Sequence, residues 1–406
     1  MIALAAGVLL AGGCKGHRLY HAQPAEYLQR LEAADPEGAG AGAPAADLSV
    51  IEFDDQGVFW EPAQLAAAVE NVRERSAASP GGVRVVLFVN SWQNDADPCR
   101  DVGDLHKFKK RLSLMAARYA RPEAGGGEPS RVVGVYLGWR GRTALGPGFR
   151  STSFWNRRRA ALRVAHGSVR EAVLEVLTAA AVNPRSKAYV AGHSMGGMIV
   201  AQALGPSLTT LLLTSGPGGV KLPTDVVVLL NPALDALSSW RLVTLLKRTE
   251  ARVELRGPGG VLAREPGPLA ASITSEADAV LDIAFPIGTG VEHLTHSFRG
   301  RIGPQGMPKQ RYLATHAEGK VDALVSHRAW VDDGGRVRLE RLRGAWNDTP
   351  YWVIRVTEEI SSGHSDTDNP RINELLDRIS ALNGLHETEV EPWLLRGPEP
   401  AGGDAP

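Results

Sequence analysis

Apolar runs of strand length recur along this chain, with amphipathic stretches between them. The run at residues 83–89 is nearly continuously apolar, which is typical of a strand buried on both faces of a sheet. Six further runs also predict strands: 48–53, 131–139, 187–191, 225–232, 269–275 and 351–357. Helical spacing predicts helices at 62–76, 104–120, 154–180 and 369–382. This alternation predicts an α/β fold, a mostly parallel, doubly wound sheet flanked by helices.

Three parts of the chain depart from that alternation. Residues 58–60 follow the first strand after a short turn, and we expect them to return as the second strand of an antiparallel edge hairpin. Residues 285–349 show no clear strand–helix unit, so we expect an irregular, cap-like insertion there. Residues 386–406 include a Pro/Gly-rich end and are expected to be disordered. The folded domain is therefore predicted to span residues 48–385.

The charge composition excludes some classes of partner. Lysine plus arginine and aspartate plus glutamate both total 45 in the 406 residues, so the formal net charge is zero. A neutral chain offers no general attraction to nucleic acid, and we expect no nucleic-acid partner. With 43% hydrophobic and 22% charged residues, the composition is that of a soluble globular protein.

The N-terminus carries a targeting pattern. Residues 1–13 are small and apolar, too few to span a bilayer, and end in Leu-Ala-Gly-Gly directly before Cys14. This resembles the signal peptide of a bacterial lipoprotein. The resemblance implies cleavage before Cys14, lipid on its thiol, and a membrane-anchored protein of the bacterial cell envelope, with a secreted or periplasmic protein as the alternative. Residues 14–47 turn polar and then Ala/Gly/Pro-rich, which predicts a flexible tether.

The most informative stretch is Gly192-His193-Ser194-Met195-Gly196, between a short apolar strand and an apolar helix start. It matches the G-x-S-x-G nucleophile elbow in the context that this motif requires. A serine at the tip of so sharp a turn needs small flanking residues, because larger side chains would collide. The elbow would expose the Ser194 hydroxyl and aim the backbone N–H of Met195 at a developing oxyanion.

On these residues the chain resembles the α/β-hydrolase superfamily over roughly residues 48–385. The resemblance implies a catalytic triad in the order serine, acid, histidine, each in a loop after a strand. Asp278 follows the strand at 269–275 and is the expected acid, with Glu276 as the alternative. His364 follows the last strand, after a glycine and before a helix, and is the expected base.

The loop after residues 83–89 is where the family carries His-Gly and its second oxyanion donor. This chain has Asn90-Ser91-Trp92 there, a departure from the family pattern. We expect the N–H of Ser91 or Trp92 to serve, with Trp92 preferred.

The predicted activity is that of a serine hydrolase, carboxylesterase- or lipase-like, which cleaves a small-molecule or lipid ester through an acyl-enzyme. No cofactor is needed, and no metal is expected, because the scattered histidines form no known ligand motif. Two alternatives stay open: a non-catalytic envelope scaffold that kept the fold, favoured by Asn90-Ser91, and an acyltransferase. Arg157–Arg159 are expected to lie on a solvated helix face rather than to bind an anion.

Overall fold

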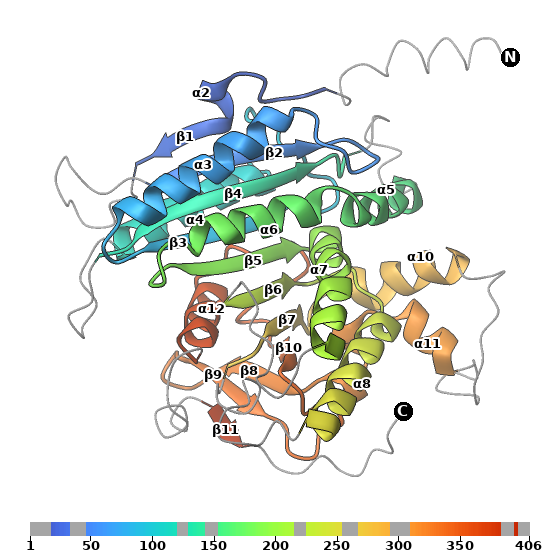
Figure 1. The fold of residues 1–406 in the computed structure, drawn as a ribbon. Coiled ribbons are helices and arrows are strands. Elements are labelled where there is room, and N and C mark those ends of the chain that lie inside the picture. Colours follow the sequence, from blue (N-terminus) through green and yellow to red (C-terminus); the bar gives the residue numbers. More distant parts are fainter. Residues whose placement is uncertain are drawn as a thin grey trace, which may run out of the picture. The chain divides into compact units, whose positions relative to one another are not determined.

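The computed structural model describes residues 18–32, 46–119, 129–142, 153–214, 225–253, 267–292, 309–382 and 394–396. They divide into two compact units, one up to Ala203 and one from Leu204 onward. Figure 1 shows strands and helices alternating along both units. The fold belongs to the α/β class, with mostly parallel strands flanked by helices.

The described part of the first unit contains a five-stranded sheet. Its strands are β1 Leu28–Leu31, β2 Ala46–Phe53, β3 Val83–Val89, β4 Arg131–Trp139 and β5 Lys187–His193, in the order β1-β2-β4-β3-β5. Strands β2, β4, β3 and β5 are parallel, and β1 runs antiparallel to β2. Every residue of β2 is buried, as expected of a strand covered on both faces.

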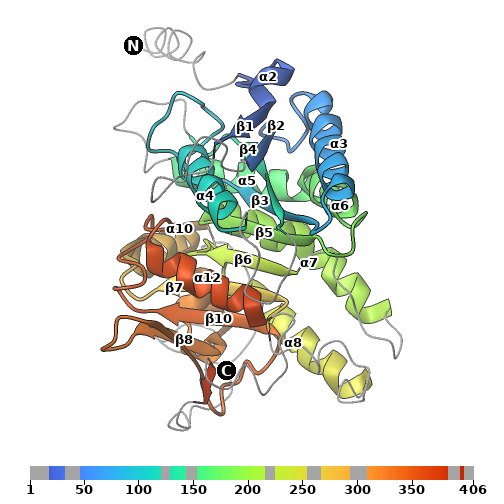
Figure 2. The same ribbon diagram turned by 90° about the vertical axis from the view of Figure 1, so that its left-hand side faces the viewer.

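Helices cover both faces of this sheet. Figure 2 shows α4 (Asp104–Tyr119) on one face and α3 (Pro62–Ala78) with α6 (Val169–Ala180) on the other. The single helix expected over 154–180 is in fact two, α5 (Phe154–His166) and α6. The break falls at Gly167, where a Cβ would lie 2.4 Å from the carbonyl oxygen of Gly57, so the contact between these two backbones ends the helix.

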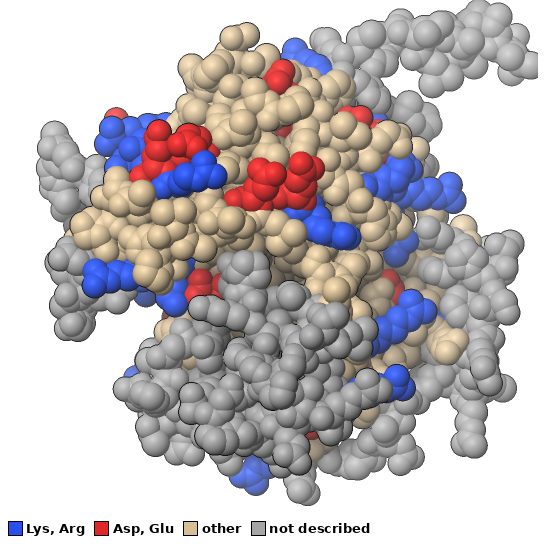
Figure 3. All heavy atoms as spheres, viewed as in Figure 1, with Lys and Arg blue, Asp and Glu red and all other residues tan. Residues whose placement is uncertain are grey.

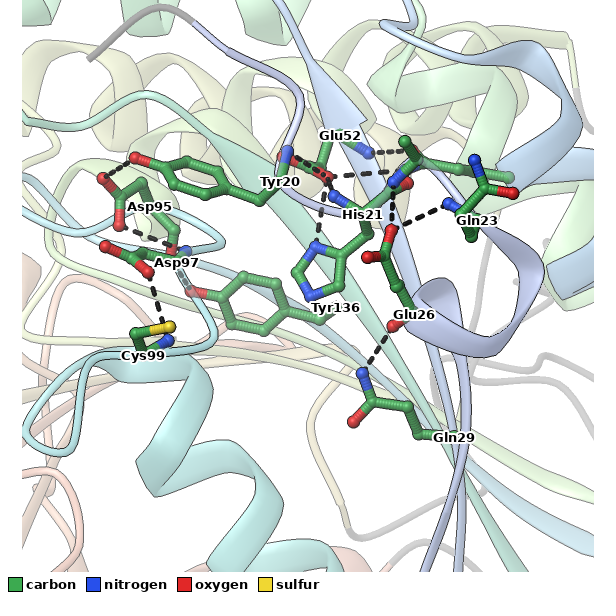
Figure 4. A network of polar contacts seen from close by, with 12 residues as sticks. Tyr20, His21, Gln23, Glu26, Gln29, Glu52, Asp95, Asp97, Cys99 and Tyr136 are labelled. Carbon is green, nitrogen blue, oxygen red and sulfur yellow. Dashed lines mark hydrogen bonds and ion pairs between the residues drawn. The ribbon is translucent and has the colours of Figure 1, made fainter. Parts of the chain in front are cut away.

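The tether expected over 14–47 is wrong for residues 18–32, which form the short helix α2 (Pro24–Tyr27) and strand β1. Polar contacts hold this segment to the unit (Figure 4). The backbone N–H of His21 donates to Glu52 Oε1 at 2.8 Å, and the His21 ring lies 3.1 Å from the same oxygen. Tyr20 donates its hydroxyl to Asp95 Oδ2 at 3.1 Å. The composition of residues 14–47 does not predict this folded segment, because its partners Glu52 and Asp95 lie far from it in the sequence.

The folded N-terminal segment also corrects the expected edge hairpin. The antiparallel partner of β2 is β1, with Leu28 opposite Ser49 and Leu31 opposite Ala46. Residues 58–60 contribute only a single antiparallel bridge, between Phe59 and Phe53. Strand β2 is consequently an internal strand rather than an edge.

The described part of the second unit contains a six-stranded sheet. Its strands are β6 Val226–Leu230, β7 Ala270–Ser275, β8 His327–Val331, β9 Val337–Arg341, β10 Tyr351–Val356 and β11 Leu394–Arg396, in the order β6-β7-β10-β8-β9-β11. Strands β6, β7, β10 and β8 are parallel. Strand β9 is antiparallel to β8 and parallel to β11.

Two expectations for this half were wrong. The supposed insertion at 285–349 contains the hairpin of β8 and β9, which extends the sheet. The sequence shows no continuous apolar run for β8 or β9, because only one side of each strand is buried. Ala329 and Leu339 face inward, while Arg328 is exposed. The tail expected to be disordered over 386–406 supplies β11. The structure does not describe the rest of that tail.

Helices of the second unit flank its sheet. They are α8 (Ala236–Val253), α10 (Phe285–Glu292), α11 (Lys309–Thr315) and α12 (Pro370–Leu382), with a π-helical turn at Val280–Ala284 and 3-10 turns at Glu318–Lys320 and Asp322–Leu324. Helix α7 (Met195–Thr214) runs across the boundary between the units. In Figure 2, α12 lies in front of β7 and β10.

The surface and the helices agree with a neutral globular composition. In Figure 3, acidic and basic side chains lie next to one another on the face shown, without a large area of one sign. None of the helices in the described ranges is long and apolar enough to cross a membrane.

Candidate active site

Ser194 occupies the turn between β5 and α7, where its backbone adopts a left-handed conformation with φ of 54°. Such an angle is uncommon for a residue other than glycine and costs free energy. Two neighbouring glycines make the turn possible. A Cβ on Gly192 would lie 2.5 Å from backbone atoms of Gly196, and a Cβ on Gly196 would lie 2.2 Å from the carbonyl oxygen of Val89. The backbone therefore has the strained geometry of a nucleophile elbow.

The same close approach joins the elbow to the loop after β3. A Cβ on Gly196 would also lie 2.6 Å from the carbonyl oxygen of Asn90, so the first turn of α7 packs directly against this loop. Met195, at the first position of α7, is buried with 1% of its surface exposed. Its N–H belongs to the positive end of a helix, which favours a negative oxygen nearby.

Asn90 is the first residue of the loop after β3, and its side chain fixes this loop to β4. Asn90 is fully buried; its Oδ1 accepts the backbone N–H of Trp139 at 2.9 Å, and its Nδ2 donates to the Trp139 carbonyl at 3.1 Å. The Trp139 indole N–H in turn donates to the Asn90 carbonyl at 2.7 Å. Asn90 thus fixes this loop to β4 through its side-chain amide and its backbone carbonyl.

The two candidate donors in this loop are not equivalent. The backbone N–H of Ser91 donates to Asp104 Oδ2 at 2.7 Å, and Asp104 is buried, so this N–H is already used. Of the two expected oxyanion donors, the backbone N–H of Trp92 is therefore the better candidate. Its ring packs edge-on against Phe154, with the ring centres 5.7 Å apart.

Asp278 and His364, predicted to be the acid and the base, meet in the second unit. His364 Nδ1 lies 2.7 Å from Asp278 Oδ2. The Asp278 side chain is fully buried, and that of His364 is 14% exposed. A carboxylate on Nδ1 fixes the tautomer in which Nε2 can accept a proton.

The other oxygen of Asp278 has a separate partner. Oδ1 accepts the backbone N–H of Leu281 at 3.0 Å, which satisfies a donor in the first turn of the following helix. The carboxylate therefore both orients a histidine and supports a helix start. Glu276, the alternative acid, lies on the surface and pairs with Arg328 at 3.1 Å.

The structure thus places the predicted residues in two groups. Ser194, Met195 and Trp92 belong to the first unit, and Asp278 with His364 to the second. Cys14 lies outside the described residues. Within the described ranges no group of three or more histidine, cysteine, aspartate or glutamate side chains could hold a metal ion.

Two polar residues near these groups differ from expectation or were overlooked. Arg157 was expected to be solvated, but only 5% of its side chain is exposed and it forms a double contact with Asp55, at 2.9 and 3.0 Å. Asn231 was overlooked; its side chain donates to the carbonyl of His364 at 3.1 Å. The sequence signal available was an asparagine near the end of the predicted strand 225–232, because asparagine tolerates the left-handed backbone that Asn231 adopts.

A cavity of about 340 Å³ opens at the carboxyl ends of β2 and β4. Ligands of open α/β sheets bind at this end of the strands. Charged and aromatic side chains line it, among them Tyr20, Trp60, Asp95 and Arg140. Burial, reinforced by Asp95, raises the pKa of Tyr20 to about 12, so this phenol stays protonated and can donate.

No protein-family model matches the chain, and no curated protein matches it. Among solved structures, it is similar to phospholipase PlaB from Legionella pneumophila, with 14% identity, a TM-score of 0.29, and coverage of 76% of this chain and 60% of that chain. The chain thus spans less than two thirds of that protein's length. At this TM-score, the likeness carries no argument about substrate or mechanism.

Proposed function

We propose that the chain is a serine hydrolase of the α/β-hydrolase type that cleaves a carboxylic ester through a triad of Ser194, His364 and Asp278. The observation that carries the proposal is the 2.7 Å contact between His364 Nδ1 and the buried Asp278 carboxylate. The left-handed Ser194 between two closely packed glycines supports it from the side of the nucleophile.

In the proposed reaction, Ser194 Oγ attacks the ester carbonyl while His364 Nε2 takes the hydroxyl proton. Asp278 holds the ring and stabilises the imidazolium. The N–H groups of Met195 and Trp92 bind the oxyanion of the tetrahedral intermediate. His364 then returns the proton to the leaving alcohol, and water releases the acyl group by the same steps. The reaction requires His364 Nε2 to reach hydrogen-bond distance of Ser194 Oγ.

A fluorophosphonate probe tests this proposal, because it reacts with an activated serine and mimics the tetrahedral intermediate. We expect labelling of the wild-type chain at Ser194 and none in Ser194→Ala or His364→Ala. Label that persists in Ser194→Ala would refute the assignment. A wild-type chain that neither labels nor turns over any activated ester would favour the non-catalytic scaffold instead. Product analysis with added alcohol distinguishes transfer to water from transfer to an alcohol.

We also propose that the protein is a lipoprotein of the bacterial cell envelope, anchored through lipid on Cys14. The support is the apolar segment 1–13 that ends in Leu-Ala-Gly-Gly directly before this cysteine. Metabolic labelling with a fatty acid tests it. Label should depend on Cys14 and survive in Cys99→Ser, whereas an unlabelled wild-type protein would contradict the anchor.

A further inference from the structure

Asn231, directly after β6, combines burial with an unusual backbone conformation. Only 3% of the residue is exposed, and its φ is 40°, in the left-handed region. Asparagine enters this region more readily than other residues with side chains, but at a cost in free energy. A strained residue persists where its surroundings hold it in place, and several contacts hold Asn231.

Those contacts tie three chain segments together. The Asn231 side-chain Nδ2 donates to the carbonyl oxygens of Gly363 and His364, at 3.2 and 3.1 Å. Its Oδ1 accepts the backbone N–H of Ser275, at the end of β7, at 2.9 Å. Its own backbone N–H donates to the Ile273 carbonyl at 2.7 Å. One amide thus joins the end of β6, the end of β7 and the loop of the histidine.

The two tied loops are those that carry the acid and the base. Ser275 lies three residues before Asp278, and the Nδ2 contact reaches the backbone of His364 itself. Only an amide can make this set of bonds, because it offers two donors and an acceptor on one planar group. An aspartate at position 231 would have the same shape, but it would place a carboxylate oxygen against the carbonyl oxygens of Gly363 and His364, which would repel it.

We propose that Asn231 is a positioning residue for the base, which holds the His364 loop at the distance where Nδ1 meets Asp278. This inference rests on the proposed function, because it assigns Asn231 a role in orienting the same histidine. It predicts that loss of the amide impairs proton transfer more than substrate binding. In metal sites, outer partners that orient a ligating histidine contribute about 10- to 100-fold to affinity or activity, and we expect a loss of that order here.

Asn347 provides a matched control within the same unit. It is also buried, its Nδ2 donates to the carbonyls of Leu324 and Tyr351 at 3.0 and 2.9 Å, and its Oδ1 accepts the Thr349 hydroxyl at 2.9 Å. It ties loops that carry no proposed catalytic group. Asn231→Asp and Asn347→Asp therefore make the same chemical change, with and without a connection to His364.

The experiment compares the full-length variants by ester turnover, fluorophosphonate labelling rate and unfolding midpoint. We expect Asn231→Asp to lower kcat and the labelling rate by about 10- to 100-fold with little change in KM. Asn347→Asp should shift the unfolding midpoint but keep the wild-type kcat. Equal kcat losses in the two variants would overturn the proposal, because they would show a general effect on the fold.

A double-mutant cycle separates positioning from stability. In an Asp278→Ala background, where the base is no longer oriented, Asn231→Asp should cause almost no additional loss of activity. An additional loss as large as in the wild type would overturn the proposal. If Asn231→Asp does not fold, Asn231→Gly replaces it, because glycine accepts the positive φ without strain.

A readout that needs no turnover distinguishes this inference from the proposed function. The proton on His364 Nδ1 should give a low-field NMR resonance that disappears in Asp278→Ala. We expect Asn231→Asp to shift or broaden this resonance and Asn347→Asp to leave it in place. An unchanged resonance in Asn231→Asp overturns the positioning role, whereas failure of wild-type Ser194 to label overturns the hydrolase itself.

Discussion

Replacement of Asp278 separates the two tasks of one carboxylate, because its oxygens have different partners. Oδ2 meets His364 Nδ1 at 2.7 Å, and Oδ1 accepts the Leu281 N–H at 3.0 Å. Asp278→Asn keeps an oxygen for Leu281 but loses the carboxylate that fixes the tautomer of His364. Asp278→Ala removes both contacts. The two variants should therefore be equally inactive and unequally stable.

The magnitudes follow from the contacts. In a serine protease, the corresponding change of aspartate to asparagine lowers kcat by about 10⁴, and we expect a loss on the order of 10⁴ for both variants. Loss of a side-chain acceptor at a helix start costs about 1 kcal/mol. In a unit of about 200 residues, that difference lowers the unfolding midpoint by about 2–4 °C. Asp278→Ala should melt lower than Asp278→Asn by this amount.

The assay combines ester turnover with thermal unfolding followed by circular dichroism. Glu276→Gln is the control, because Glu276 is a surface residue paired with Arg328 and should contribute little. Turnover by Asp278→Asn above a tenth of the wild-type kcat would refute the orienting role. Equal midpoints for Asp278→Asn and Asp278→Ala would refute the helix contact. A large loss of kcat in Glu276→Gln would restore the alternative acid.

Three further predictions concern the elbow, the buried Glu318 and the part-buried Asp55. Gly196→Ala should abolish probe labelling and destabilise the fold, because its Cβ would lie 2.2 Å from a backbone oxygen. Labelling of Gly196→Ala would contradict the packed elbow. Burial raises the pKa of Glu318 above its ordinary 4.5, so the folded state holds this proton more tightly than the unfolded state. The free energy of unfolding should therefore fall as pH rises through the folded pKa, which urea titrations at several pH values can measure. A fall that persists in Glu318→Gln would contradict the assignment. Burial opposes ionisation of Asp55, but the hydrogen bonds from Arg157 and Arg140 outweigh it and lower the pKa. Asp55→Ala should take the carboxylate partner from the buried Arg157, which keeps its contacts to Asn156 and to the Arg140 carbonyl, and should cost about 1–3 kcal/mol by urea unfolding. No measurable loss would show that the pair is dispensable.

The sequence predicted those elements that a short stretch of residues specifies by itself. Strand 83–89 could be recognised because burial on both faces makes it nearly all apolar, and the elbow because glycines must flank its serine. Strands β1 and β9 could not, since each is short and carries polar residues outward. Their existence depends on distant partners, such as the contact of His21 with Glu52, which no window of the sequence contains.

The candidate site shows the same division. Motif order pointed to Ser194 and His364, but Asp278 and Glu276 occupy one loop, and only the fold brings one of them to the histidine. Arg157 was misjudged because a run of arginines normally faces solvent, whereas here Asp55, about a hundred residues away, pairs with it. The contacts of Asn231 likewise depend on the fold, because they join the ends of β6 and β7 to the loop of His364.

The folded N-terminal segment changes the reach of the proposed anchor. A tether over residues 14–47 could extend roughly 110 Å, far enough to search a wide volume above a membrane. Arg18, the first described residue, lies four positions after Cys14, and four extended residues span at most about 14 Å. If Cys14 carries lipid, Arg18 and the cavity that it lines at the carboxyl ends of β2 and β4 must stay close to the bilayer surface.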